Sequence, residues 1–268
     1  MFHSNPPVAL SIAGFDGSGG AGVHADCRTF ERAGVYGVSV LTSVVAQSPG
    51  SVSGIEAVSK GLVQAQLKEI STSFPIVAAK TGMLATAETV EAVADFFRRF
   101  PDIKLVIDPV LKASAGEELT SVKFIGLMKE RLFGRACLVT PNRMEAETIL
   151  GMEIRSMDSM RVAALKFWEN FGCNALVKGG HFDQVSTEIC DVLVMDGEFE
   201  ELRAPRLDVP DLHGTGCTLS AAITAELAKG RDLGASVIIA QHQLRSWMKD
   251  YHEWDSPRKI QAINALKD

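Results

Sequence analysis

Features that would mark a secreted, membrane-bound or zinc-binding protein are missing from this 268-residue sequence. The five cysteines are odd in number and include no Cys-X-X-Cys pair, which argues against a disulfide framework and against a zinc site. No stretch approaches the ~20 apolar residues of a membrane span. The first residues, MFHSNPP, also lack the basic and apolar regions of a signal peptide. These absences predict a cytoplasmic protein without a membrane partner.

An excess of positive charge is missing as well. The chain has 27 Lys and Arg against 33 Asp and Glu, for a net charge of -6. Nucleic-acid binding depends on clustered Lys and Arg that neutralise phosphates, so no nucleic-acid partner is expected. A few local cations would suffice for a small anionic substrate. The 46% hydrophobic and 22% charged residues are ordinary for a soluble globular protein.

Apolar, β-branched runs recur along the chain, and most are followed by a polar or glycine-rich turn and then a helical pattern. VALSIAG, VSVLTSVVAQ and IKLVIDPVL are such runs, and they predict buried parallel strands. AETVEAVADFFRRF repeats apolar residues at helical spacing. The alternation predicts an α/β fold, with a doubly wound, mostly parallel central sheet and helices on both faces. Because no linker interrupts it, residues 1–268 are expected to form a single domain.

Two later details qualify this pattern. Asp196 and Gly197 separate two short strand-like runs, which predicts an antiparallel hairpin at one edge of the sheet. The segment SPGSVSG after Gln47 is interpreted as a loop. Near the C-terminus, TLSAAITAELAKG and GASVIIAQHQLRSWMKDY predict two closing helices.

The carboxyl ends of the predicted strands carry polar residues or glycine. Open parallel sheets bind ligands beyond these ends, so one edge of the sheet is expected to carry the chemistry. The residues concerned are Gly14, Asp16, Gln47, Lys80, Thr81, Asp108, Asn142 and Lys178.

The first glycine-rich turn matches GxGxxG at Gly17, Gly19 and Gly22, between a strand and a helix. This is weak support for a dinucleotide site, because the next strand ends in Ala-Gln-Ser and not in the acidic residue that would hold a ribose. Asp26 lies about one turn into the following helix. It is either a functional carboxylate or a solvated one that compensates the helix dipole.

The second glycine-rich turn, HGTGC, precedes a strongly helical run. The backbone amides of Gly214, Thr215, Gly216 and Cys217 lack helical partners and can converge on a phosphate oxygen. The same helix start is expected to lower the thiol pKa below about 8.5, which would let Cys217 accept a proton from a substrate hydroxyl. The alternative is a buried, inert cysteine at a glycine turn.

Two further acidic positions suit a magnesium ion. Asp108 ends a strand and Glu145 starts a helix, and Mg²⁺ favours a few carboxylates combined with water and phosphates. Helix capping is the alternative role for Glu145. Lys178 leaves a buried strand beside two glycines, where it would bind a nucleotide phosphate or simply be a solvated strand end.

Seven segments in order resemble the hydroxymethylpyrimidine/phosphomethylpyrimidine kinases of thiamin synthesis, in the ribokinase-like superfamily. The resemblance runs from about residue 8 to 250 and implies an enzyme that uses ATP and Mg²⁺. Its reaction would phosphorylate 4-amino-5-hydroxymethyl-2-methylpyrimidine and then the monophosphate. The segments are SIAGFDGSGGAGVHAD, YGVSVLTSVVAQ, AAKTGML, VIDPV, LVTPNRMEAE, LVKGGH and HGTGCTLSAA.

The resemblance also implies roles for particular residues. Pyrimidine recognition would fall to Gly14, Asp26, Gln47 and Met83. Catalysis would fall to Cys217 and the anion hole of Gly214, Thr215 and Gly216. The nucleotide would meet Lys178, Asn142 and Asp108, with the metal on Asp108 and Glu145. A homodimer is the assembly that family members often adopt.

Three other functions stay open at this point. A pyridoxal or pyridoxine kinase would use the same anion hole for another hydroxymethylated heterocycle. A catalytically silent pyrimidine-binding protein would keep the fold alone, and a dehydrogenase would use the first glycine loop. Phe15 and the SPG after Gln47 depart from the commoner family pattern beside the expected substrate pocket.

Overall fold

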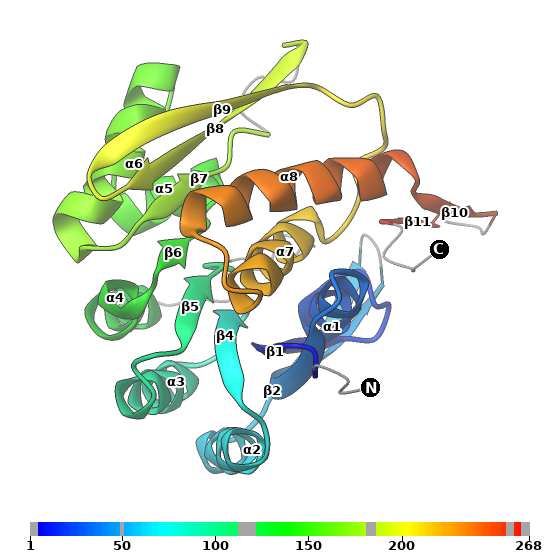
Figure 1. Cartoon of the computed structure of the whole chain (residues 1–268), viewed down its shortest axis with the longest axis vertical. Coiled ribbons are helices and arrows are strands. Elements are labelled where there is room, and N and C mark those ends of the chain that lie inside the picture. Colours follow the sequence, from blue (N-terminus) through cyan, green and yellow to red (C-terminus); the bar gives the residue numbers. More distant parts are fainter. Residues whose placement is uncertain (1–4, 49–50, 112–121, 181–185, 256–259, 264–268) are drawn as a thin grey trace.

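The computed structural model describes residues 5–48, 51–111, 122–180, 186–255 and 260–263, and its centre is a nine-stranded sheet (Figure 1). In the order β3-β2-β1-β4-β5-β6-β7-β8-β9, the strands from β2 to β7 run parallel and the strands beyond them pair antiparallel. The strands are β1 (Val8–Asp16), β2 (Tyr36–Ser48), β3 (Ser51–Ala57), β4 (Ile76–Thr81), β5 (Lys104–Ile107), β6 (Leu138–Val139), β7 (Ala175–Val177), β8 (Glu188–Met195) and β9 (Glu198–Pro205).

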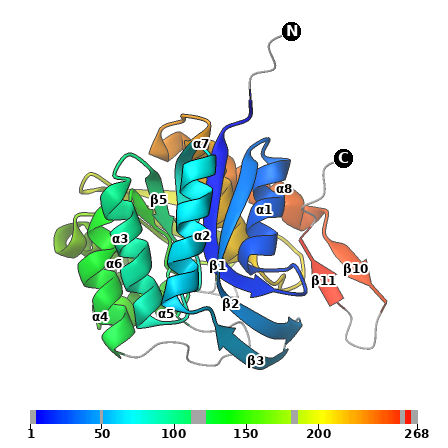
Figure 2. The same ribbon diagram turned by 90° about the horizontal axis from the view of Figure 1, so that it is seen from below.

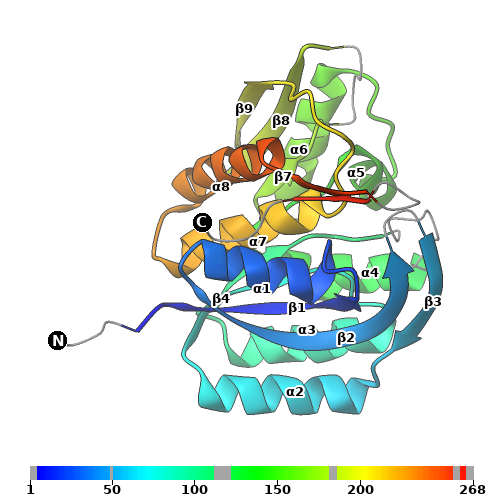
Figure 3. The same ribbon diagram turned by 90° about the vertical axis from the view of Figure 1, so that its right-hand side faces the viewer.

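Helices cover both faces of this sheet (Figures 2 and 3). Successive residues of β1 point to opposite faces, so Leu10 and Ile12 pack in one core cluster and Ala9 in the other. The first cluster lies under α2 to α6, and the second under α1, α7 and α8. The helices are α1 (Gly22–Arg32), α2 (Lys60–Ser73), α3 (Ala87–Arg99), α4 (Val122–Arg131), α5 (Arg143–Leu150), α6 (Met157–Phe171), α7 (Thr215–Ala228) and α8 (Leu233–Lys249).

The predicted doubly wound sheet and its antiparallel hairpin are confirmed, with Asp196 and Gly197 forming the turn between β8 and β9. The interpretation of SPGSVSG as a loop is wrong in part, because Ser51–Ala57 forms β3 and pairs with β2. β3 is an edge strand with mostly accessible residues, so it carries no continuous apolar run to reveal it. A small hairpin of β10 (His252–Trp254) and β11 (Ile260–Ala262) was likewise not expected from the sequence.

The topology gathers the predicted polar residues at one edge of the sheet. β1 ends at Asp16, β4 at Thr81 and β5 one residue before Asp108, while a short bridge pairs Asn142 with Lys178. α7 begins at the same edge and is buried along most of its length. Among the described residues, no helix is both long and apolar enough to cross a membrane.

Candidate active site

Two glycine loops pack backbone against backbone at this edge. A Cβ on Gly214 would lie 1.7 Å from the carbonyl oxygen of Gly20, and one on Gly22 would lie 2.2 Å from that of Gly14. Gly214 and Gly22 also have positive φ angles, 84° and 61°, which glycine adopts without strain. Glycine at these positions therefore lets the β1–α1 loop lie directly against the start of α7.

The first loop satisfies its own amides. The Asp16 carboxylate accepts hydrogen bonds from the backbone N–H and hydroxyl of Ser18, each at 2.8 Å, and from the N–H of Ala21 at 3.0 Å. Amides that bind a side-chain carboxylate are not free for a pyrophosphate. This arrangement argues against the dehydrogenase alternative, even though the loop matches GxGxxG.

The second loop presents a cradle that suits an anion. The N-cap residue of α7 is Gly214, which has no side chain to cap the helix, and Thr215, Gly216 and Cys217 follow it. A Cβ on Gly216 would lie 3.2 Å from the Lys178 ammonium and 3.8 Å from an Asp108 oxygen. Glycine at 216 therefore leaves space beside a cation and a helix N-terminus, which together favour a phosphate.

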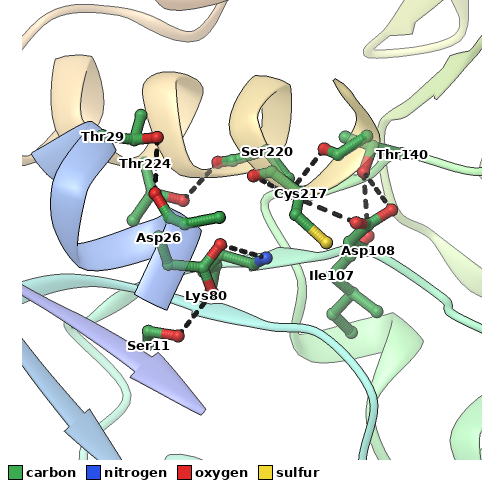
Figure 4. Close-up of polar contacts among 12 residues, drawn as sticks. Ser11, Asp26, Thr29, Lys80, Ile107, Asp108, Thr140, Cys217, Ser220 and Thr224 are labelled. Atoms are coloured by element: carbon green, nitrogen blue, oxygen red, sulfur yellow. Dashed lines mark hydrogen bonds and ion pairs between the residues drawn. The ribbon is translucent and has the colours of Figure 1, made fainter. Parts of the chain in front are cut away.

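A buried ion pair lies behind this cradle (Figure 4). The Lys80 ammonium is 2.9 Å from Asp26 Oδ1, and both side chains are fully buried. The Ser11 hydroxyl donates to Asp26 Oδ2 at 2.5 Å. Burial alone would lower the pKa of Lys80, but the Asp26 carboxylate outweighs it and raises that pKa. Asp26 is therefore not the solvated carboxylate of the alternative interpretation.

A second pair stands at the mouth of the cradle. Lys178 Nζ is 3.2 Å from Asp108 Oδ1, and 16% of the lysine side chain stays accessible. The hydroxyls of Thr140 and Ser220 also approach the Asp108 carboxylate, each at 3.4 Å (Figure 4). Lys178 is therefore partly enclosed and ion-paired, not a freely solvated strand end.

Glu145 stands near this pair and caps α5. Its carboxylate accepts the Asn142 N–H at 2.7 Å, and the Asn142 side chain accepts the Glu145 N–H at 2.9 Å. The capping alternative for Glu145 is thus confirmed. Burial raises the pKa of Glu145 to about 7, helped by the Asp108 charge and opposed by Lys178.

The predicted low thiol pKa of Cys217 is wrong for this arrangement. Burial raises the pKa of Cys217 to about 11, and the nearby carboxylates of Asp108 and Asp26 add to the effect. Lys80 and the Gly22 N–H act in the opposite direction but do not outweigh them. The thiol lies between the Lys80–Asp26 pair and Asp108 (Figure 4), and with this pKa it is protonated at neutral pH.

The residues expected to contact the pyrimidine lie at different depths below the protein surface. The space left by the missing side chain of Gly14 is filled by the Met83 methyl and the Ser43 hydroxyl, each 2.7 Å from the Cβ that glycine lacks. Asp26 is sealed behind Lys80. Gln47 lies near the surface and contacts His213 at 3.2 Å.

A cavity of about 570 Å³ opens beside Gln47 and His213, between the first glycine loop and the β10–β11 hairpin. Arg28 and Trp254 also line it. Its lining does not include Gly14, Met83 or Cys217, so it adjoins the sheet-edge site and is not the same space.

Sequence reasoning did not assign roles to Lys80, Asp16 and His213, which the fold brings into the site. Lys80 and Asp16 were visible only as strand-end residues. His213 was visible only as the neighbour of a glycine turn. Lys80 lies 54 positions from its partner Asp26, and His213 lies 197 positions from Asp16, separations that no local pattern reveals.

Magnesium fits the donors at this edge. No group of three or more His, Cys, Asp or Glu among the described residues could hold a metal by itself. Mg²⁺, however, commonly binds one or two carboxylates and completes its shell with water and phosphate oxygens. Asp108 and Glu145 are two such carboxylates, and their mutual repulsion contributes to the raised pKa of Glu145.

Comparison with known proteins decides the family. Residues 16–261 match the phosphomethylpyrimidine kinase family. The chain belongs to this family. The hydroxymethylpyrimidine/phosphomethylpyrimidine kinase of Haemophilus influenzae is 40% identical over 240 residues, which cover 89% of each chain. The predicted membership in a phosphotransferase family is thereby confirmed.

Solved structures show the same architecture. The phosphomethylpyrimidine kinase of Clostridium difficile is 31% identical, with a TM-score of 0.78, over 90% of this chain and 98% of its own. Pyridoxal kinase from Bacillus subtilis, solved as an ADP complex, is 32% identical, with a TM-score of 0.87, over 97% of both chains. The fold is therefore shared by phosphomethylpyrimidine kinases and pyridoxal kinases.

Proposed function

We propose that this protein transfers the γ-phosphoryl group of ATP to 4-amino-5-hydroxymethyl-2-methylpyrimidine and then to its monophosphate. The observation that carries the proposal is the cradle at Gly216, where the Lys178 ammonium stands beside the open start of α7 in a chain of the phosphomethylpyrimidine kinase family. A protein that only bound a heterocycle would have no need of this phosphate cradle.

The proposed mechanism depends mainly on positioning and charge. Phosphoryl transfer needs little proton transfer in its transition state, but negative charge spreads over the transferred group. The amides of Gly214, Thr215, Gly216 and Cys217 would hold these oxygens, while Lys178 and Asn142 orient the nucleotide phosphates. Gly14, Asp26, Gln47 and Met83 are the proposed pyrimidine-side residues. Asp26 would act through Lys80, because its own carboxylate is sealed from the surface.

Cys217 is the proposed proton acceptor for the substrate hydroxyl. With a pKa of about 11 the thiol holds its proton at neutral pH, so it would first have to release that proton to solvent before it could act as a base. Lys80, on one side of the thiol, favours the resulting thiolate, which would return to the thiol form as it takes the proton of the substrate hydroxyl. Asp108 and Glu145 are the residues that would hold Mg²⁺, which would neutralise phosphate charge.

The test is ATP consumption with Mg²⁺ and three acceptors, with the products identified by mass. The acceptors are the hydroxymethylpyrimidine, its monophosphate and pyridoxal. We expect the pyrimidine to be preferred and converted onward to the diphosphate. Absence of turnover with all three would support the silent binding protein instead.

Pyridoxal phosphorylation is the second candidate function. The pyridoxal kinase of Bacillus subtilis is 32% identical to this chain and shares its fold at a TM-score of 0.87, so the fold alone does not separate the two substrates. Preference for pyridoxal in the same assay would keep the anion cradle and reassign the pocket around Gln47 and Met83.

A further inference from the structure

Asp191 is a buried carboxylate to which the proposed function assigns no role. It lies in β8, where Val192 and Val194 belong to one core cluster and Leu193 belongs to the cluster under α8. Because Asp191 is two positions before Leu193, its side chain points to the same face of the sheet. An apolar residue would suit this face, since burying a carboxylate is costly unless its oxygens are hydrogen-bonded.

The two oxygens of this carboxylate bind partners on two different elements. Asp191 Oδ1 accepts the backbone N–H of Gly179 at 2.8 Å, and Oδ2 accepts the side-chain amide of Gln241 at 2.7 Å. Gln241 belongs to α8, which lies over this face of the sheet (Figure 1). Gly179 directly follows Lys178, just beyond the end of β7. Asp191 therefore connects α8 to the segment that carries Lys178.

The segment after β7 needs this connection because the paired strands end before it. The last pair of the β7–β8 ladder is Val177 with Val192. Beyond it, Gly179 lies so close to the neighbouring chain that a Cβ there would be 1.9 Å from the carbonyl oxygen of Cys190. The Asp191 carboxylate accepts the N–H of Gly179, and so anchors the backbone after the ladder has stopped.

Lys178 is consequently held by hydrogen bonds on both sides of its Cα. Its own N–H donates to the carbonyl oxygen of Pro141 at 2.9 Å, and the following N–H donates to Asp191. The lysine side chain is long and flexible, so the position of its ammonium depends on where the backbone is fixed. Here that ammonium lies 3.2 Å from the Cβ that Gly216 lacks, beside the phosphate cradle.

We propose that Asp191 is a positioning residue that fixes the backbone at Gly179 and thereby holds the Lys178 ammonium at the phosphate cradle. Asp191 acts through Lys178 and touches no ligand itself. The inference rests on the proposed function only in that Lys178 binds a nucleotide phosphate. It does not depend on which heterocycle accepts the phosphoryl group. Loss of Asp191 should therefore weaken phosphate contacts, and this effect should vanish once the Lys178 ammonium is removed.

The experiment is a double-mutant cycle between Asp191→Ala and Lys178→Ala. It measures kcat with the preferred acceptor and Kd for a non-hydrolysable ATP analogue in the presence of Mg²⁺. Asp191→Ala alone is expected to lower kcat about tenfold and to weaken the analogue about threefold, with the KM for the acceptor unchanged within about twofold. In the Lys178→Ala background, Asp191→Ala should change kcat and Kd by less than about twofold, because both residues act through one ammonium.

Two matched variants separate this role from a purely structural one. Asp191→Asn keeps an oxygen for the Gly179 N–H, and the Gln241 amide can turn to accept from the new NH₂, so kcat should stay within about threefold of the wild-type value. Gln241→Met removes the partner on α8 but leaves the bond to Gly179. It should lower the Tm while kcat and Kd stay within about twofold.

Thermal unfolding checks that each variant is folded. If Asp191→Ala does not fold, Asp191→Leu combined with Gln241→Met takes its place in the cycle. This combination replaces two buried polar groups by apolar ones, which is less costly than leaving one of them without a partner. The same losses in kcat and Kd are expected from it.

The inference and the proposed function fail in different ways. A folded Asp191→Ala protein, or its replacement, with wild-type kcat and Kd would overturn the inference. Losses of equal size with and without the Lys178 ammonium would also overturn it, because Asp191 would then act by another route. Absence of turnover with every acceptor would contradict the proposed function, while the binding cycle would still decide the inference. A wild-type protein that does not bind the analogue would contradict both.

Discussion

Two lysine–aspartate pairs flank Cys217, and they differ in almost everything except their residue types. Lys80 and Asp26 are 2.9 Å apart and fully buried, with Ser11 as a third partner. Lys178 and Asp108 are 3.2 Å apart, and the lysine opens onto the cradle at Gly216. The side chains of the first pair are closed to solvent and present no accessible atom to a ligand. The second keeps an ammonium beside the space where a phosphate would lie.

The difference shows that burial decides what a charged pair can do. Removing two charges from water costs several kcal/mol per ion. A sealed pair is therefore stable only because its two charges attract each other and accept or donate further hydrogen bonds, and its role lies in the protein interior. In a half-open pair, the lysine can exchange its aspartate partner for a ligand that is also negatively charged. Changes in the sealed pair are therefore expected to have their largest effect on stability, and changes in the open pair to have their largest effect on turnover.

Asp26→Ala should give the largest effect. It leaves the Lys80 ammonium buried without a partner, so the free energy of unfolding should fall by about 3–5 kcal/mol. Chemical denaturation measures this loss. The double variant Asp26→Leu with Lys80→Met removes both charges and should recover most of it. A loss below about 1 kcal/mol in Asp26→Ala would mean that the pair is not sealed.

Cys217→Ala tests the group between the pairs. We expect kcat to fall by about 10²–10³-fold while the KM for the pyrimidine stays within about twofold, because only proton transfer loses its acceptor. Steady-state kinetics of Cys217→Ala and of Cys217→Ser provide the measurement. Unchanged turnover would remove the base role and leave the thiol as the inert cysteine of the alternative interpretation.

Lys178→Ala removes the ammonium of the open pair. We expect kcat to fall about 10²-fold, because the transferred phosphoryl group loses a charge that stabilises it. Stability should fall less than in Asp26→Ala, since Asp108 keeps the Thr140 and Ser220 hydroxyls as partners. Lys178→Arg, which retains the charge, should lose less activity. Equal stability losses in the Lys178 and Asp26 variants would erase the distinction between the pairs.

Much of the fold could be predicted from the sequence, because buried parallel strands and amphipathic helices leave periodic patterns. The edge strand β3 was missed because accessible residues leave no such pattern. At the site, the residue types at the strand ends indicated chemistry at one edge. Their burial could not be predicted, since it depends on segments such as Ser11, Asp26 and Lys80 meeting across the fold. The Cys217 pKa was misjudged for the same reason.

The titration of Glu145, which lies near the open pair, is expected to make the free energy of unfolding depend on pH. Its pKa is raised to about 7, so between about pH 4.5 and 7 the folded chain holds a proton that the unfolded chain has released. The free energy of unfolding should therefore fall as pH rises through this window, by about 3 kcal/mol, and this contribution should not change above it. Denaturation at several pH values measures the slope. Glu145→Gln should flatten it, and a slope that persists would assign the titration to another group.

Gly216→Ala makes the smallest change, one methyl group at the mouth of the cradle. Its Cβ would lie 3.2 Å from Lys178 Nζ, so it should crowd the phosphate site and lower kcat about tenfold, a barrier increase of about 1.4 kcal/mol. Gly61→Ala in α2 is the matched control, because nothing lies within 4 Å of its Cβ. Both variants replace a helical glycine, so both gain about 0.5–1 kcal/mol of helix propensity. Activity lost only at position 216 would locate the chemistry at the open pair, whereas equal activity in both variants would move it elsewhere along the sheet edge.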